Sequence, residues 1–471
     1  MQVSKTPFMK KARQTLIGNR AFYAMVLAIV VPIIIQNAIT NFVNLLDNIM
    51  VGKIGTDQMT GVSIANQLLF VANLCVFGGM SGAGIFSAQY HGAGNREGVQ
   101  HCFRYKIYLA VLLTAAVVLI FSLLGEPLIS LYLNDGDSMD RSTRTLGYGM
   151  EYLRMMLWGF APFAFSQAYA STLRETGETT LPMRAALTGV FLNLVLNYTL
   201  IYGHFGAPEM GVRGAALATV ISRYVELSIM LVCSHSHPDR FPFVHRIYSS
   251  MRVPLSLTKQ ITIKGMPLLA NEALWSLGVA MLSRCYSLRG LDVVAGLNIS
   301  NTVSNLFGVV FLSMGNATAI IIGQALGAGE IDRAKRETWQ LAFFSLMGSI
   351  ATAALLAISS PFIPLLYNTE SQIRALATRF LLVYAITSPL HSFCNICYFT
   401  LRSGGKTMIT FFFDCVFSWV VSIPIAYALV QFTGLNIVAC YFLVQFADII
   451  KCIIGFILVK KGIWVQNMVS E

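Results

Sequence analysis

The stretch AFYAMVLAIVVPIIIQNAITNFVNLL, residues 21–46, contains no charged residue, and the first charge after it is Asp47. A helix needs about 20 apolar residues to cross a bilayer, so this run is long enough to span one. Similar runs recur along the 471-residue chain, of which only 12% is charged, whereas soluble domains carry roughly 25%. The sequence therefore predicts an all-α integral membrane protein with little chain left for a soluble domain.

The apolar runs predict twelve transmembrane helices, centred near residues 33, 72, 113, 160, 192, 223, 272, 309, 347, 388, 420 and 448. The formal net charge is +11, and its lysines and arginines gather in the loops on one side of these spans. The positive-inside rule places those loops and both termini in the cytoplasm, and the acidic loop around Asp135, Asp137 and Asp140 outside. We therefore expect a multi-pass protein of the plasma (inner) membrane, whose basic charge reflects topology and not a nucleic-acid partner.

The chain contains an internal repeat. GIFSAQYHGAGNREG (84–98) aligns with AIIIGQALGAGEIDR (319–333), and VPIIIQN (31–37) aligns with MPLLANE (266–272). Each repeat holds six spans, and an even number returns both repeats to the same side of the membrane. This predicts two parallel six-helix lobes related by a pseudo-twofold axis along the membrane normal. The expected boundaries are a cytoplasmic N-terminus (1–20), an N-terminal lobe (21–234), a cytoplasmic linker (235–259), a C-terminal lobe (260–460) and a cytoplasmic C-terminus (461–471).

Glycine and proline mark special points of the repeat. The paired loops HGAGNREG and LGAGEIDR fit no nucleotide-binding motif, and we expect tight turns in which glycine supplies a positive φ. Pro32 and Pro267 are equivalent positions of the two repeats, each inside a predicted span. Proline removes a helical hydrogen bond, so each position is either a fixed kink or a hinge.

Asp47 is the first candidate functional residue. A charge within the membrane costs several kcal/mol, so such residues usually face a cavity and serve function. Asn193 and Asn197 lie at i and i+4 on one face of the fifth span, at a depth where they could meet Asp47. The alternative is that Asp47 is an interfacial residue at the end of its helix. The functional interpretation predicts a site for H⁺, Na⁺ or a cationic substrate.

Glu272 is the corresponding candidate in the second repeat. It follows Pro267 near the middle of the seventh span. Its equivalent in the first repeat is Asn37. Asn37 and the adjacent Gln36 are the last two candidate site residues. A purely structural, hydrogen-bonded Glu272 is the alternative. If the coupling ion is Na⁺, Glu272 or Asp47 is its expected ligand. The remaining intramembrane charges are weaker candidates for a functional site. Asp414 lies close enough to the cytoplasmic end of its span to reach water. Asp448 and Lys451, and likewise Arg223 and Glu226, have the spacing of local ion pairs.

Four phrases together resemble the multidrug and toxic compound extrusion (MATE) family, in particular its NorM/DinF-like bacterial members. They are VPIIIQNAITNFVNLLDNIMVGKIG (31–55), FLNLVLNYTLIYG (191–203), GVRGAALATVISR (211–223) and GQALGAGE (323–330). The resemblance covers essentially the whole chain. It implies export of small cationic or amphiphilic compounds in exchange for H⁺ or Na⁺, without another cofactor. We expect the protein to function as a monomer, although the sequence does not determine its oligomeric state.

The resemblance also implies roles for individual residues. Asp47 corresponds to the aspartate of the family's first span, with Asn193 and Asn197 as its polar partners, and Glu272 resembles an acid implicated in cation binding. Some members have an aspartate at the position of Asn197, so here Asp47 would work with amide partners alone.

Three other functions fit the sequence less well. A lipid-linked oligosaccharide flippase of the same wider superfamily would need several cationic residues facing its cavity, whereas the intramembrane charges here are mostly acidic. An enzyme is not expected, since the chain has neither HExxH nor GxSxG, and the Cys394–Cys397 CxxC lies in an apolar helix. A channel fits two pseudosymmetric lobes with differently placed acids less well than alternating access does.

Overall fold

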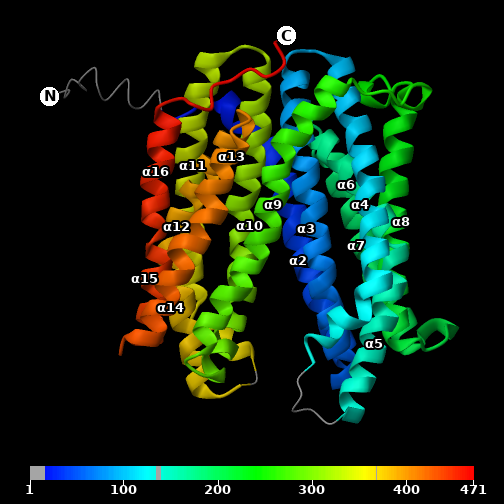
Figure 1. Cartoon of the computed structure of the whole chain (residues 1–471), viewed down its shortest axis with the longest axis vertical. Helices are drawn as coiled ribbons and strands as arrows, with labels where there is room; N and C mark the ends of the chain where they lie inside the picture. Colours follow the sequence, from blue (N-terminus) through cyan, green and yellow to red (C-terminus); the bar gives the residue numbers. More distant parts are fainter. Residues whose placement is uncertain (1–15, 134–138, 368, 471) are drawn as a thin grey trace. The chain divides into compact units, whose positions relative to one another are not determined.

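A computed structural model describes residues 16–133, 139–367 and 369–470, and every regular element in these ranges is helical (Figure 1). Segment 1–15 and the outer-loop residues Asp135 and Asp137 lie outside the described residues. The helices of the first part of the chain are α2 (Arg20–Gly52), α3 (Thr56–Gly92), α4 (Arg96–Ser130), α5 (Met139–Trp158), α6 (Phe160–Glu175), α7 (Thr180–Tyr202) and α8 (Gly211–Ser236). Those of the second part are α9 (Leu255–Ser287), α10 (Leu291–Gly327), α11 (Ile331–Ser359), α12 (Ser371–Ser403), α13 (Thr407–Phe411), α14 (Ile423–Phe432), α15 (Ile437–Phe446) and α16 (Asp448–Lys460), with two π-helical segments, η5 (Phe412–Val416) and η6 (Ser418–Ser422), between α13 and α14.

Ten helical stretches among the described residues are long and apolar enough to cross a membrane. The other two predicted spans, centred near residues 160 and 272, do not meet this measure. The first is divided at Gly159 into α5, which is rich in polar residues, and α6, which has only 16 residues. The second lies on α9, where Asn271 and Glu272 interrupt the apolar run. The membrane class is therefore clear, whereas the count of twelve spans remains a prediction.

The chain divides into two compact units. Unit 1 comprises residues 1–34, 88–94 and 266–471, and unit 2 comprises residues 35–87 and 95–265. Within unit 1, α12 packs against α10, α11 and α16, and within unit 2, α8 packs against α5, α6 and α7 (Figure 1). The helices α2, α3 and α9 contribute residues to both units. This grouping follows packing and not sequence repetition, so the predicted lobe boundaries remain a prediction.

The core of unit 1 joins segments that are far apart in the sequence. Phe22, Val26 and Ile33 of α2 are buried in one cluster with residues of α10 and α11, including Ala317 and Leu341. The apolar face that begins the chain is therefore covered mainly by the second half of the sequence. Between helices in a membrane, such packing stabilises through van der Waals contact, because lipid is as apolar as the buried side chains.

The repeated glycine loops are the tight turns that the sequence predicts. Gly94 and Gly329, at equivalent positions, have φ angles of 71° and 74°. Two further equivalent glycines lie where α3 meets α10: a Cβ atom at Gly92 would collide with the backbone oxygen of Gln324, and one at Gly327 would collide with that of Gln89. Gln89 and Gln324 are themselves equivalent in the repeat alignment. The two repeats therefore cross here through reciprocal contacts that only glycine permits.

The C-terminal segment of residues 461–470 is hydrogen-bonded to the helices at this crossing. The Gln89 side-chain nitrogen donates to the carbonyl oxygens of Ser403 (2.9 Å) and Gln466 (3.3 Å), and its oxygen accepts from the backbone N–H of Met468 (2.8 Å). The Asn467 amide donates to the carbonyl oxygen of Gly327 at 3.3 Å. Gln89 is fully buried, so this set of bonds satisfies a polar group that would otherwise be costly to bury.

Candidate functional site

The structure brings Asp47 of α2 together with the two asparagines of α7. Asn197 is 1% exposed, and its side-chain nitrogen donates to Asp47 Oδ1 at 2.7 Å. Asn193, one turn earlier and 6% exposed, lies beside both residues. The i, i+4 spacing predicts this contact, because it places both amides on one helix face.

The amide of Asn193 has two useful orientations. In one, its oxygen accepts from Asn197 and its nitrogen donates to the Thr219 hydroxyl, each at 3.1 Å. In the other, its nitrogen lies 3.0 Å from Asp47 Oδ2 and its oxygen lies 3.1 Å from the Thr219 hydroxyl. The second orientation gives Asp47 two amide donors, in place of the hydrogen bond from Asn197 to Asn193. Neutral hydrogen-bond donors stabilise and orient a carboxylate without cancelling its charge. Asp47 therefore keeps its capacity to bind a cation.

Two residues near this site were not anticipated from the sequence. Thr219 of α8 completes the hydrogen bonding of Asn193, and the buried Tyr152 of α5 lies close enough to Asp47 to feel its charge. A polar residue within the apolar run of α8 was the available signal for Thr219. For Tyr152 the sequence offered none, because tyrosine is common in apolar helices.

The other predicted residues of α2 lie away from this cluster. Gln36 and Asn37 are half-buried, and they precede Asp47 by three turns of helix, or about 15 Å. The structure therefore does not bring them to the Asp47 carboxylate.

Glu272 lies in a second polar cluster, in unit 1. The charges that act on it most strongly are those of Arg402 on α12 and Asp414 on η5. Its neighbour Asn271, 2% exposed, donates from its side-chain nitrogen to Asp414 Oδ2 at 3.2 Å. Glu272 thus faces both a cation and a second carboxylate, unlike Asp47, whose hydrogen-bond partners are amides.

The expected pairing of Asp448 with Lys451 is wrong. Lys451 instead bonds Asp414 across the helices, with Nζ 3.0 Å from Oδ1, while Asp448 Oδ2 lies 3.4 Å from His391 Nε2. Proximity in sequence was misleading because the Lys451 ammonium reaches a carboxylate on a different helical segment, η5. Asp414, expected to reach water, is half-buried and is also a member of the polar cluster. The charges of Arg223 and Glu226 do act on each other, as their spacing predicts. Arg223 also donates to the carbonyl oxygen of Gly159 at 3.3 Å and lies over the Phe163 ring.

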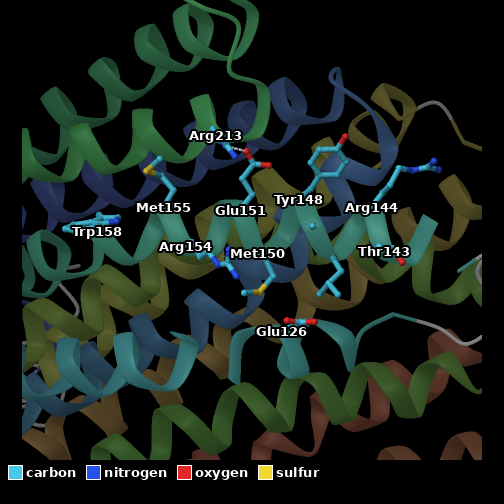
Figure 2. A pocket seen from close by; sticks show the side chains of 12 residues that line it. Glu126, Thr143, Arg144, Tyr148, Met150, Glu151, Arg154, Met155, Trp158 and Arg213 are labelled. Carbon is cyan, nitrogen blue, oxygen red and sulfur yellow. Dashed lines mark ion pairs between the residues drawn. The ribbon is translucent and has the colours of Figure 1, made fainter. Parts of the chain in front are cut away.

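A surface pocket of about 790 Å³ lies elsewhere in unit 2, along α5. Figure 2 shows Glu151 and Arg213, which form an ion pair, pointing toward each other at this pocket. Arg144 is paired with Asp57 and Asp140. The pocket is lined by Glu126, Thr143, Arg144, Leu146, Gly147, Tyr148, Met150, Glu151, Arg154, Met155, Trp158 and Arg213. None of these is a predicted site residue, and much of its charge is already neutralised.

Neither carboxylate cluster is a metal centre of three or more acids, histidines or cysteines. Within residues 16–133, 139–367 and 369–470, no such group is found that could hold a metal ion. Cys394 and Cys397 are buried in α12. A sodium ion would therefore have to use one or two carboxylates together with amide, hydroxyl or backbone oxygens.

Comparison with known proteins decides the family. The MatE family model matches residues 32–199 and 267–428, which is most of the chain and includes both repeats. The chain belongs to the MATE family. It is therefore a multi-pass membrane transporter and not an enzyme, as the resemblance noted from the sequence implies.

Individual relatives of this MATE transporter match over nearly their full length. It is 25% identical over 448 residues to the probable multidrug resistance protein NorM of Thermotoga maritima, covering 93% of this chain and 92% of the relative. It is 28% identical over 408 residues to the multidrug resistance protein MdtK of Pectobacterium atrosepticum, covering 85% and 86%. The probable multidrug resistance protein YoeA of Bacillus subtilis is 25% identical over 479 aligned positions, covering 100% and 99%.

Solved structures share the fold. An outward-facing MATE family transporter of the MOP superfamily superposes with a TM-score of 0.84 at 20% identity, covering 98% of this chain and 99% of that one. A MOP superfamily transporter from Pyrococcus furiosus gives 0.82 at 20% identity, covering 96% and 98%.

Proposed function

We propose that this MATE transporter is a secondary active multidrug efflux antiporter that exports small organic cations in exchange for H⁺ or Na⁺ by alternating access. Its relatives NorM, MdtK and YoeA are named as multidrug resistance proteins, which supports drug-like substrates. The observation that carries the proposal is the Asp47 carboxylate, held by the amide of Asn197 at 2.7 Å.

The exchange follows from charge. A single carboxylate with neutral partners can hold a cationic substrate or the coupling ion, but not both. The Asn197 side-chain oxygen is buried and accepts no hydrogen bond from the described residues, so an acceptor is available beside Asp47 for a bound proton or cation. Binding of one cation therefore favours release of the other, which is the requirement for antiport.

The gradient of the coupling ion supplies the driving force. A one-for-one exchange of a monovalent organic cation for H⁺ or Na⁺ moves no net charge, so the membrane potential adds nothing to it. One pH unit supplies about 1.4 kcal/mol for each proton, which corresponds to a concentration ratio of about ten.

The remaining parts of the proposal concern architecture. We place the chain in the plasma (inner) membrane as a monomer of twelve spans in two six-helix lobes, with both termini in the cytoplasm and Glu272 as a second coupling residue. The ten apolar stretches and the basic loops support this arrangement. Pro32 and Pro267 are the proposed hinges, and each lies within two residues of the point where its helix passes from one unit to the other, at 34/35 and 265/266.

The test uses everted membrane vesicles and the fluorescent cation ethidium. Uptake would be driven by an imposed pH gradient alone and then by a sodium gradient alone, for the wild type, Asp47→Asn and Glu272→Gln. We expect at least one gradient to drive uptake and Asp47→Asn to reduce it by at least tenfold. The variant that abolishes uptake identifies the coupling residue.

Asp57→Asn is the matched control, because Asp57 is an aspartate of unit 2 whose partners are the surface residues Arg141 and Arg144. It should transport like the wild type. If the folded wild type moved no ethidium under either gradient, a cationic cargo would be contradicted and lipid-linked substrates would be tested next. Normal export by Asp47→Asn under every gradient would exclude Asp47 as the coupling residue.

A further inference from the structure

Asp414 of unit 1 has both carboxylate oxygens occupied by nitrogen donors. Lys451 Nζ of α16 lies 3.0 Å from Oδ1, and the Asn271 side-chain nitrogen of α9 lies 3.2 Å from Oδ2. Lys451 is 8% exposed and Asn271 is 2% exposed. The carboxylate is therefore neutralised by a cation that belongs to the protein.

The Lys451 ammonium occupies a position built for a cation. Its Nζ lies 5.8 Å from the centre of the Phe413 ring and 5.6 Å from that of Phe417. Phe413 lies in η5 beside Asp414, and Phe417 directly follows this π-helical segment. π-helical turns are frequent at functional sites. Two aromatic faces and a carboxylate together stabilise a buried positive charge.

The groups that remain around Glu272 are a poor shell for a metal ion. Arg402 and Tyr398 of α12, and Asp414 of η5, are the titratable or charged groups that act on it. The Asn271 side-chain oxygen is buried and accepts no hydrogen bond from the described residues, so it is an oxygen ligand without a partner. With Asp414 taken by Lys451, Glu272 is the one carboxylate of this cluster left for a metal ion, beside neutral oxygens such as this amide and the Tyr398 hydroxyl.

A proton and a sodium ion place different demands on such a cluster. A proton needs one carboxylate oxygen, whereas a hard metal cation needs a shell of several oxygens. A second carboxylate is the group that would complete that shell, and the Lys451 ammonium already holds it. The geometry therefore favours a proton over sodium at Glu272.

We propose that Lys451 is a resident cation that occupies the place on Asp414 which Na⁺ would need, and so makes the Glu272 site proton-selective. This rests on the proposed antiport and specifies its coupling ion in unit 1. Removal of the ammonium, with Asp414 kept, exposes a site of two carboxylates and the Asn271 amide oxygen, and that site takes Na⁺.

The test measures ²²Na⁺ binding to the purified full-length protein in detergent, by scintillation proximity in a choline medium. The variants are Lys451→Gln, the double variant Lys451→Gln/Asp414→Asn, and Lys460→Gln. Lys460 is a matched control, because it lies on the same helix, 5.6 Å over the Phe456 ring, but is exposed. We expect Lys451→Gln to bind Na⁺ at least tenfold more tightly than the wild type and Lys460→Gln, and the double variant to lose this gain.

Two results would overturn the proposal. One is a monodisperse, folded Lys451→Gln protein that binds no more Na⁺ than the wild type. The other is saturable Na⁺ binding by the wild type that Asp414→Asn removes, and this measurement decides the matter even if Lys451→Gln does not fold. Neither result depends on ethidium transport, so a failure here is distinguishable from a failure of the proposed antiport.

Discussion

At the scale of single residues, the two acidic clusters differ in the kind of partner each carboxylate has. Asp47 accepts from amides, whereas Asp414 is paired with a lysine and Glu272 faces Arg402. Amide donors leave a carboxylate its charge, and a cationic side chain cancels it. Asp47 is therefore the carboxylate best suited to exchange cations.

The role of the amide is testable with Asn197→Leu. Leucine has nearly the shape of asparagine, but it removes the donor to Asp47. A hydrogen bond to a charged group contributes about 1.5–3 kcal/mol, so we expect ethidium transport to fall by roughly tenfold or more while the expression level is retained. Initial rates of uptake into vesicles, normalised to protein amount, measure this effect.

Thr199→Val is the control for this substitution. Thr199 lies on the same helix, is half-buried, and its hydroxyl donates only to the backbone oxygen of Val195 among the described residues, at 2.8 Å. It should transport at the wild-type rate. Equal rates for the two variants would mean that Asn197 does not act through Asp47.

At the scale of elements, the crossing of α3 and α10 depends on the lack of a side chain at two equivalent glycines. Gly92 and Gly327 each face the backbone oxygen of the other repeat's glutamine, and backbone atoms cannot move aside as a flexible side chain can. The segment of residues 461–470 adds hydrogen bonds to Gln89 at this crossing. The local contact thus joins both repeats and the end of the chain.

Gly327→Ala should destabilise the protein, because the new methyl group would collide with the Gln89 backbone. Overpacking of this kind costs about 1–3 kcal/mol or more. Gly348→Ala is the control: it lies within α11, and a Cβ atom there meets nothing within 4 Å. Alanine is up to about 1 kcal/mol more favourable than glycine in a helix, so this change should be neutral or stabilising. Melting temperatures in detergent compare the two, and equal values would contradict the reciprocal crossing.

At the scale of the whole molecule, three helices carry the chain from one compact unit to the other. Two of them, α2 and α9, contain a proline close to the point of passage. A proline in a helix removes a backbone hydrogen bond and weakens the helix where it bends. The repeat relation between Pro32 and Pro267 therefore coincides with the division of the molecule into units.

A hinge role predicts a specific pattern for Pro32→Ala and Pro267→Ala. Restored helical hydrogen bonds should stiffen both positions, so turnover should fall severalfold while the affinity for ethidium, measured by fluorescence anisotropy, stays within about twofold. Pro389→Ala is the control, because Pro389 lies inside α12, which belongs wholly to unit 1. Loss of affinity with no change in turnover would instead assign the prolines to binding.

The sequence by itself determined the membrane class, the helical content, the repeat, the family and the acids at Asp47 and Glu272. Hydropathy, periodicity and an unexpected charge are properties of the local sequence. They can be recognised without knowing which residues lie next to them in the folded protein. The i, i+4 asparagines extend this to one contact between helices, because both amides share a face of α7 and Asn197 donates to Asp47 of α2.

Only the tertiary structure decided which charged side chains pair with one another. Lys451 is three residues from Asp448 in sequence, yet its ammonium bonds Asp414 of another helix, and Gln89 is satisfied by the far end of the chain. Such pairings depend on how helices distant in sequence are rotated against each other and on the π-helical turn at Asp414. The physical reason is that charge pairing acts across space, whereas sequence spacing reports only neighbours along one helix.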